Sequence, residues 1–217
     1  MSQAAEPGGA MKSGKHSAFN DLIYIFERHI ERSVEAAREF HWLLVAVDGD
    51  TAASERRIHE LRRAADAITD LALTAMERHH GPSSLQDESL VLIRHLGALL
   101  EWIECAAERM KTTSAPPPRV FEMAKTLVRA TEEIQALLSS LHDPKRINER
   151  SFGCAKVRGL THETHPAGEA ERRELPPQHE LVLTSMMHAL SECDAIATLV
   201  EKEALSRRSR PPPHAHL

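Results

Sequence analysis

The spacing of the apolar residues constrains this chain most, because they recur at steps of three and four along most of the sequence. Such steps place side chains on one face of an α-helix, which turns once in about 3.6 residues. The first stripe runs from Phe19 to Val47 and ends at Asp48-Gly49-Asp50. Further stripes begin at Ile58, Ile93, Val120 and Leu183. They leave no run of alternating polar and apolar residues long enough for a β-strand, so the pattern predicts an all-α protein.

Helix-breaking residues divide these stripes into separate helices. The second helix ends at His80-Gly81-Pro82, the run TTSAPPP at 112–118 follows the third, and Asp143-Pro144 closes the fourth. A weaker fifth helix is expected over 147–160, where Gly153 and Gly159 each cost about 1 kcal/mol relative to Ala. The polar segment 161–177 reads as an irregular connection or a frayed helix, and the last helix covers about 177–206.

The third and last stripes have the same spacing. Six apolar positions from Ile93 to Met110 are each followed, 90 residues later, by an apolar position of the last helix, from Leu183 to Val200. This spacing indicates two repeated three-helix halves, which bury their apolar faces against each other. The competing interpretation is that any two amphipathic helices can be slid into register.

We therefore predict a six-helix up-down bundle built from two pseudo-repeated three-helix halves. Its domain is expected over 17–206, with halves at about 17–111 and 117–206. The segment 1–16 and the basic, proline-rich segment 207–217 are expected to be disordered tails, since neither offers an apolar face to bury.

Charge and composition exclude several classes of protein. The net charge is −5, from 27 Lys and Arg against 32 Asp and Glu, which argues against nucleic acid as a partner. Three cysteines without a C-x-x-C pair fit a reducing cytosol. The segment 1–16 lacks the apolar core of a signal peptide, and the densest apolar stretch, 42–47, is far shorter than the roughly 20 residues of a membrane span. We expect a cytoplasmic protein that does not insert into the membrane itself.

Histidine motifs give no support for catalysis. Glu77 and His80 form a single E-x-x-H pair at a helix end, whereas a di-iron bundle needs a second copy and two further glutamates. His162 and His165 are three residues apart rather than the four of a metalloprotease helix. No phosphate-binding loop or nucleophile motif occurs, so we predict no catalytic or cofactor-binding residues and no enzymatic activity.

Motifs in three of the expected helices point to a known family. The first helix contains Phe19-Asn20-Asp21-Leu22, Phe26-Glu27-Arg28-His29 and Val34-Glu35-Ala36-Ala37-Arg38. The second contains the run from Ile58 to Thr69, and the third contains the run from Leu96 through Glu101 to Met110. In order and spacing they resemble the PhoU-like family of phosphate-transport regulators, in the branch associated with Pit-type inorganic phosphate transporters. The likeness covers about 19–111 well and 177–205 loosely. It implies two three-helix bundles, which agrees with the periodicity.

The resemblance also implies metal binding by acids one helical turn apart, and here the sequence departs from the family. At the positions of Arg62 and Gly97 the family has acids. These two positions lie one helical turn before the acids that remain here, Asp66 and Glu101. The corresponding positions of the second half are Ser151, Ala155, Met187 and Ser191. Asp70 and Glu104 lie one turn from the remaining acids, so the candidate metal ligands are Asp66, Asp70, Glu101 and Glu104.

From these residues we expect at most one labile divalent or iron ion, and weak or absent metal binding in the second half. Arg62 is four residues from Asp66 and can pair with it. If Glu101 faces them from the next helix, Arg62 would supply the positive charge that a metal would otherwise bring.

The function implied by the resemblance is non-enzymatic regulation of inorganic phosphate transport. The expected partner is a membrane phosphate transporter of the Pit type or its regulator, which would hold the protein at the inner face of the membrane. The sequence leaves open whether the protein also forms a homo-oligomer. Two alternatives remain from the sequence: a metal-binding helical-bundle protein, and a structural interaction module without a phosphate role.

Overall fold

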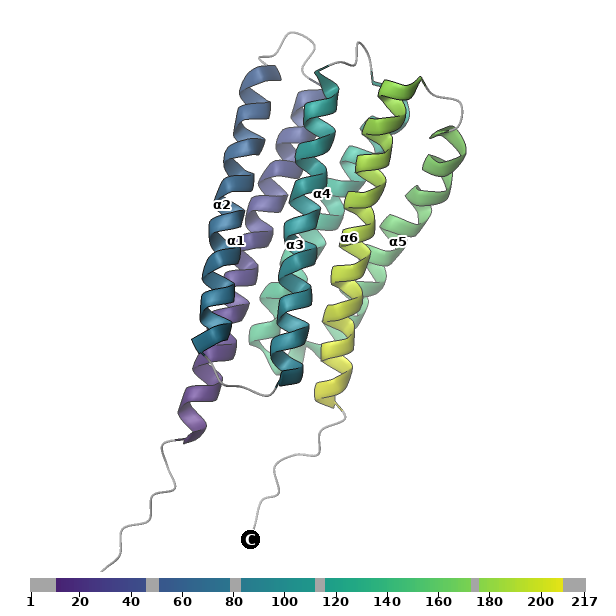
Figure 1. Cartoon of the computed structure of the whole chain (residues 1–217). Coiled ribbons are helices and arrows are strands. Elements are labelled where there is room, and N and C mark those ends of the chain that lie inside the picture. The colour runs from purple at the N-terminus through teal and green to yellow at the C-terminus, as the bar shows by residue number, and fades with distance from the viewer. Residues whose placement is uncertain (1–10, 46–50, 79–82, 112–115, 173–175, 209–217) are drawn as a thin grey trace, which may run out of the picture.

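The computed structural model describes residues 11–45, 51–78, 83–111, 116–172 and 176–208 (Figure 1). These residues form six α-helices and, between the fourth and fifth, two short 3₁₀ turns, η1 (Ser140–His142) and η2 (Pro144–Arg146). The helices are α1 (Met11–Val45), α2 (Thr51–Arg78), α3 (Ser83–Met110), α4 (Pro118–Ser139), α5 (Ile147–Arg172) and α6 (Pro177–Arg208). The predicted all-α six-helix bundle is confirmed.

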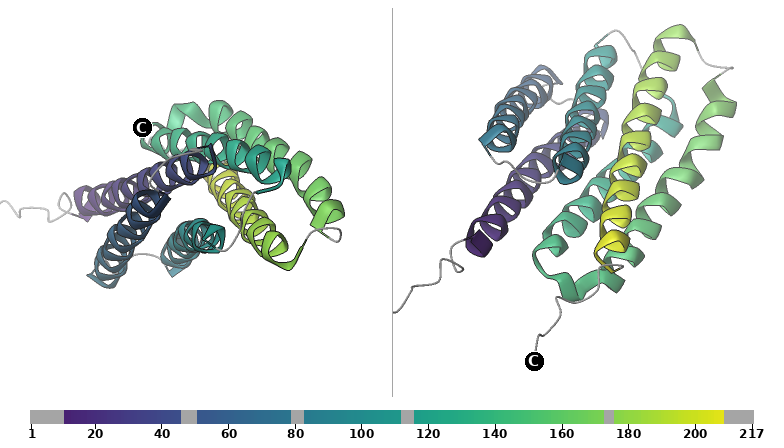
Figure 2. Two further views of the ribbon diagram at one scale, coloured as in Figure 1. Left: turned by 90° about the horizontal axis from the view of Figure 1, so that it is seen from above. Right: turned by 60° about the horizontal axis from the view of Figure 1, so that its bottom comes forward.

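Consecutive helices run up and down, and two helix pairs join the halves (Figure 1). α1 lies along α4, and α3 lies along α6, so these four helices form the centre of the bundle. α2 packs on α1 and α3, and α5 packs on α4 and α6. Figure 2 shows α2 and α5 on opposite flanks, which leaves each of them one face against the bundle and one face outward.

The apolar stripes form one continuous core that includes residues from every helix. In α6, all six predicted stripe positions from Leu183 to Val200 are buried. In α3, the matching positions from Ile93 to Ala107 are buried, and Met110 is packed against the core. The shared spacing of these two helices therefore reflects their shared role, since each turns its stripe into the same core.

The structure extends α5 beyond the predicted end at residue 160, to Arg172. Polarity was a misleading signal there, because the threonine hydroxyls bond to their own helix. Thr161 Oγ1 donates to the Arg158 carbonyl at 3.1 Å, and Thr164 Oγ1 donates to the Leu160 carbonyl at 2.8 Å. Both threonines are buried, which their satisfied hydroxyls permit. Of the two alternatives for 161–177, the irregular connection is wrong for residues 161–172, which are helical.

At the ends of the chain, α1 begins at Met11, inside the segment expected to be a tail, and α6 reaches Arg208. Residues 1–10 and 209–217 lie outside the described part of the chain.

Gly153 permits a close approach between α5 and α4. A Cβ atom added at this position would lie 2.6 Å from Leu137 Cδ2 and 3.2 Å from Leu137 Cγ, and Leu137 is buried. At Gly159, on the same helix, an added Cβ would meet nothing within 4 Å. Both glycines lower the helix propensity of α5 to the same extent, but only at position 153 does the packing of a neighbouring helix favour glycine over a larger residue.

These glycines make a matched pair for measuring stability. We expect Gly159→Ala to raise the free energy of unfolding by about 0.5–1 kcal/mol, because alanine favours the helix. Gly153→Ala should be at least about 1 kcal/mol less stable than Gly159→Ala, because Leu137 must move. Urea unfolding followed by circular dichroism measures both, and equal gains in the two variants would contradict the close packing of α5 on α4.

Candidate functional site

The polar face shared by α2 and α3 contains the residues that the sequence marked as metal ligands. The two helices run antiparallel, and buried Ile58, Leu61 and Ala65 place the apolar side of α2 against the bundle. At three places along the edge of this contact, polar side chains link α2 to α3 or to Lys111, the residue that follows α3. The links are Glu55 to Lys111 at 3.0 Å, His59 to Glu104 at 2.5 Å, and Arg62 to the Gly97 carbonyl at 2.8 Å.

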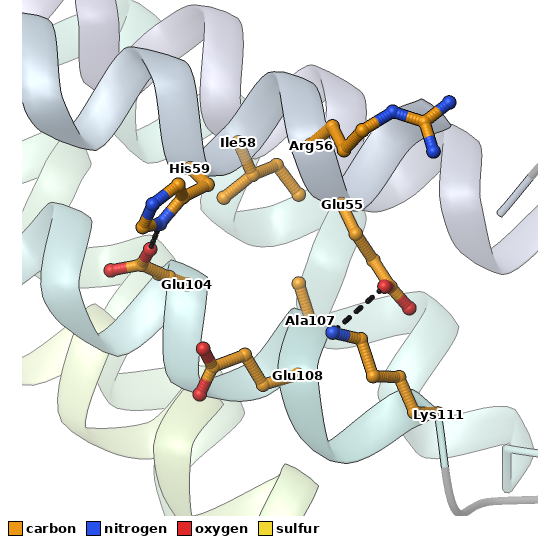
Figure 3. A pocket seen from close by; sticks show the side chains of 8 residues that line it. All are labelled: Glu55, Arg56, Ile58, His59, Glu104, Ala107, Glu108 and Lys111. Atoms are coloured by element: carbon orange, nitrogen blue, oxygen red, sulfur yellow. Dashed lines mark hydrogen bonds and ion pairs between the residues drawn. The ribbon is translucent and has the colours of Figure 1, made fainter. Parts of the chain in front are cut away.

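A cavity of about 290 Å³ lies between α2 and α3 at the first two of these links (Figure 3). Its apolar base includes Ile58 and Ala107, both buried. Its rim is charged and of mixed sign, with the Glu55–Lys111 and His59–Glu104 pairs drawn in Figure 3 and the Glu108 carboxylate between them. Such a rim suits a small polar group or a charged side chain of a partner better than a single bare ion.

Arg62 forms the third link, and its guanidinium lies within 4 Å of one carbonyl and two carboxylates. Its Nη1 donates to the Gly97 carbonyl at 2.8 Å, and its Nη2 lies 3.2 Å from Asp66 Oδ1 and 3.9 Å from Glu101 Oε2. The Arg62 side chain is 21% exposed, whereas Asp66 and Glu101 are 55% and 61% exposed. The guanidinium therefore sits inward of the two carboxylates, between them and the α3 backbone.

The structure brings together only two of the four candidate metal ligands. Asp66 and Glu101 meet at Arg62, while Glu104 turns away to His59 and Asp70 lies exposed on α2. Among the described residues, no group of three His, Cys, Asp or Glu side chains is placed to hold a metal ion.

His59, Glu55 and Lys111 were missed by the sequence analysis. A signal for His59 was available, because it precedes Arg62 by three residues and Asp66 by seven, which is the spacing of one helix face. Its partner Glu104 could not be assigned without the register between α2 and α3. Glu55 and Lys111 pair near the ends of their helices, where no motif marks them.

The corresponding positions of the second half carry no charge. Ser151 Oγ donates to the Ile147 carbonyl at 3.3 Å, and Ser191 Oγ donates to the Met187 carbonyl at 3.0 Å, so both hydroxyls bond within their own helix. Met187 is buried and Ala155 is exposed. The polar face of the first half therefore has no counterpart at these positions between α5 and α6.

His162 contacts a neighbouring helix, and Cys154 and Cys193 are buried in the core. His162 Nε2 lies 3.6 Å from Asp194 Oδ1 and links α5 to α6, while His80 and the side chain of His165 lie outside the described residues. Burial raises the pKa of the Cys154 thiol to about 11 and raises the pKa of Cys193 further still. Both thiols are therefore protonated near neutral pH, which makes them weak nucleophiles.

The arrangement of the helices matches two solved structures from Shewanella oneidensis MR-1. One is a PhoU-like protein, with a TM-score of 0.57 and 14% identity over 86% of this chain and 96% of that one. The chain has the PhoU-like fold. The second, described as a PhoU-like phosphate regulatory protein, has a TM-score of 0.53 and 12% identity over 86% of this chain and 99% of its own. No protein-family model matches the sequence, and neither does any curated protein.

None of the helices in the described ranges is both long enough and apolar enough to cross a membrane.

His29 lies buried in α1 and is coupled electrostatically to Arg62. Its side chain is fully buried, and neither ring nitrogen has a hydrogen-bond partner. Burial, with a smaller contribution from the Arg62 charge, lowers the pKa of His29 from 6.5 to about 4. His29 is therefore neutral at pH 7 and acts as a core side chain rather than as a charged site.

We expect acid to destabilise the fold through His29. Because its pKa is lower in the folded state, the unfolded chain binds the proton more readily between pH 6.5 and 4. The stabilising neutral state is complete above pH 6.5 and is lost as the pH falls toward 4, at a cost of about 3 kcal/mol. Urea unfolding of wild type and His29→Leu at pH 7.5 and pH 4.5 measures this difference.

His29→Leu should lose less stability between these pH values than wild type does. His162→Leu serves as the control, because the His162 side chain is 72% exposed, and it should keep the pH dependence of wild type. An unchanged pH dependence in His29→Leu would contradict the assignment of His29 as a buried neutral base.

Proposed function

We propose that this protein is a non-enzymatic regulator of inorganic phosphate transport, and that it acts by binding a membrane phosphate transporter of the Pit type or that transporter's regulator. The observation that carries the proposal is the fold. Six helices in two halves match nearly the whole length of a protein described as a PhoU-like phosphate regulatory protein. The motifs of the first three helices, which resemble the Pit-associated branch, support the choice of transporter.

The chemistry of the described polar groups supports binding rather than catalysis. The two thiols of Cys154 and Cys193 are buried and protonated. On the α2/α3 face, Arg62 and Glu104 are engaged in contacts that join helices, so these groups stabilise the surface on which they lie. A rigid helical surface with a mixed-charge cavity suits recognition of another protein.

In this proposal the protein works at the cytoplasmic side of the membrane and is held there by its partner. The partner would recognise the outer helical surface, since the centre of the bundle is filled by its own core. Phosphate itself need not enter the bundle for regulation to occur.

Deleting the gene should change phosphate uptake by the cell. We expect the initial rate of radiolabelled phosphate uptake, and tolerance of high external phosphate, to differ between the deletion strain and its parent. Wild-type protein supplied in trans should restore both. A tagged copy purified from detergent-solubilised membranes should carry a phosphate transporter or its regulator with it.

The control is complementation with Leu100→Asp, which places a charge at a fully buried core position and should prevent folding. It keeps the transcript but removes the bundle, so it should fail to restore uptake. Identical uptake kinetics and phosphate tolerance with and without the gene would refute the regulatory function. Restoration by Leu100→Asp would show that the folded bundle is not what acts.

A further inference from the structure

The Arg62 side chain on the α2/α3 face contacts a backbone carbonyl of α3 and lies within 4 Å of two carboxylates. The guanidinium donates a hydrogen bond to the Gly97 carbonyl on α3, pairs with Asp66 on its own helix at 3.2 Å, and faces Glu101 on α3 at the longer distance of 3.9 Å. A guanidinium is suited to this task, because its planar fork carries five N–H donors and never loses its charge.

The residues at this position do not fit the metal that the resemblance implies. Divalent cations in proteins take several oxygen ligands at about 2.0–2.6 Å, and carboxylates supply most of the neutralising charge. Here the first acid of each expected pair is replaced, by Arg62 on α2 and by Gly97 on α3. A metal ion bound to Asp66 and Glu101 would also stand beside the guanidinium, whose like charge repels it.

We infer that Arg62 is a built-in cation of the α2/α3 face: its guanidinium takes the place of a metal ion between Asp66 and Glu101 and joins α2 to the α3 backbone. The positive charge of the face then belongs to the chain itself, and α2 packs on α3 without a metal ion. This inference concerns the α2/α3 face alone and holds whether or not the proposed role in transport is correct.

Gly97 completes the arrangement through its backbone carbonyl. A carbonyl oxygen inside a helix still has a second lone pair available, and the Gly97 carbonyl uses it to accept from Arg62 Nη1. A Cβ at position 97 would lie 3.9 Å from that same nitrogen, which is an ordinary van der Waals contact, so the hydrogen bond to this carbonyl does not depend on glycine.

The second half supplies an internal comparison. Its corresponding residues, Ser151, Ala155, Met187 and Ser191, include neither a cation nor a carboxylate. α5 nevertheless packs on α6 as α2 packs on α3. The guanidinium that joins α5 to α6 lies at another position, where Arg158 pairs with Glu201 at 2.6 Å, so the two halves place their charged links differently.

The charge of Arg62 also reaches the interior of the first half. After burial, which contributes most, that charge helps to lower the pKa of His29. This provides a readout of the guanidinium's position that does not depend on stability. Removing the charge with Arg62→Met should raise the pKa of His29, as measured by NMR titration of its ring protons.

The metal test compares Arg62→Glu with Arg63→Glu. Arg63 is the next residue and is exposed, so its variant makes the same change of charge without touching the link. Each protein is dialysed against Mn²⁺, Zn²⁺ or Fe²⁺ and analysed for bound metal. We expect wild type and Arg63→Glu to retain no stoichiometric ion, and Arg62→Glu to take up one ion that raises its melting temperature until a chelator removes it.

Arg62→Met keeps the inference testable if Arg62→Glu fails to fold. This variant retains the aliphatic part of the side chain, and it should unfold at a lower urea concentration than wild type, with no rescue by metal. The inference would be overturned by a stoichiometric ion on Asp66 and Glu101 in the wild-type protein. It would equally be overturned if folded Arg62→Glu bound no more metal than Arg63→Glu, or if Arg62→Met matched wild type in both stability and the pKa of His29.

Discussion

The burial of apolar residues where the two halves meet is the constraint on which the rest of the structure depends. α1 lies along α4 and α3 lies along α6, and side chains from all four helices enter one core. Residues such as Leu100 and Met186 are fully buried, and each side chain of this size contributes about 1.5–3 kcal/mol. A three-helix half alone would expose the stripe that the other half covers.

Polar contacts follow the edge of this junction and fix its register. On α3 and α6, His95 Nδ1 lies 2.6 Å from Glu192 Oε2. Further along the same pair, the rings of Trp102 and His188 stack with their centroids 4.4 Å apart. His95 and Trp102 are seven residues apart, two turns of one helix face, so the contacts repeat along the edge of the buried stripe. They align the two helices, while the apolar core supplies most of the stability.

Because α1, α3, α4 and α6 form the centre of the bundle, the contacts that hold α2 and α5 against it can differ. α2 uses that freedom for the links to α3, which surround a cavity and include Arg62. α5 uses it differently, with a close approach to α4 at Gly153 and an ion pair between Arg158 and Glu201 of α6. The two halves thus share an architecture but not a surface, and a partner would meet different chemistry on each flank.

The sequence predicts well what depends on periodicity within one helix. The stripes of α3 and α6 mark buried faces, and both enter the same core. The sequence predicts poorly whether a polar side chain finds a hydrogen-bond partner inside the protein. At the polar end of α5, Thr161 and Thr164 are buried because their hydroxyls donate to carbonyls of the same helix. The Arg62–Asp66 pair can be predicted from the sequence because both residues lie in one helix. The His59–Glu104 contact cannot be predicted without the register between α2 and α3.

The most direct test of this account is equilibrium unfolding followed by two probes. Trp42 lies on α1, and Trp102 lies on α3 where it stacks on His188 of α6, so their fluorescence reports on the first half and on its contact with α6, while far-UV circular dichroism reports on all six helices. If the halves depend on one shared core, the two signals will change together in urea, with the same midpoint and the same slope. A fluorescence transition separate from the loss of helix would show that the halves unfold independently and would contradict the account.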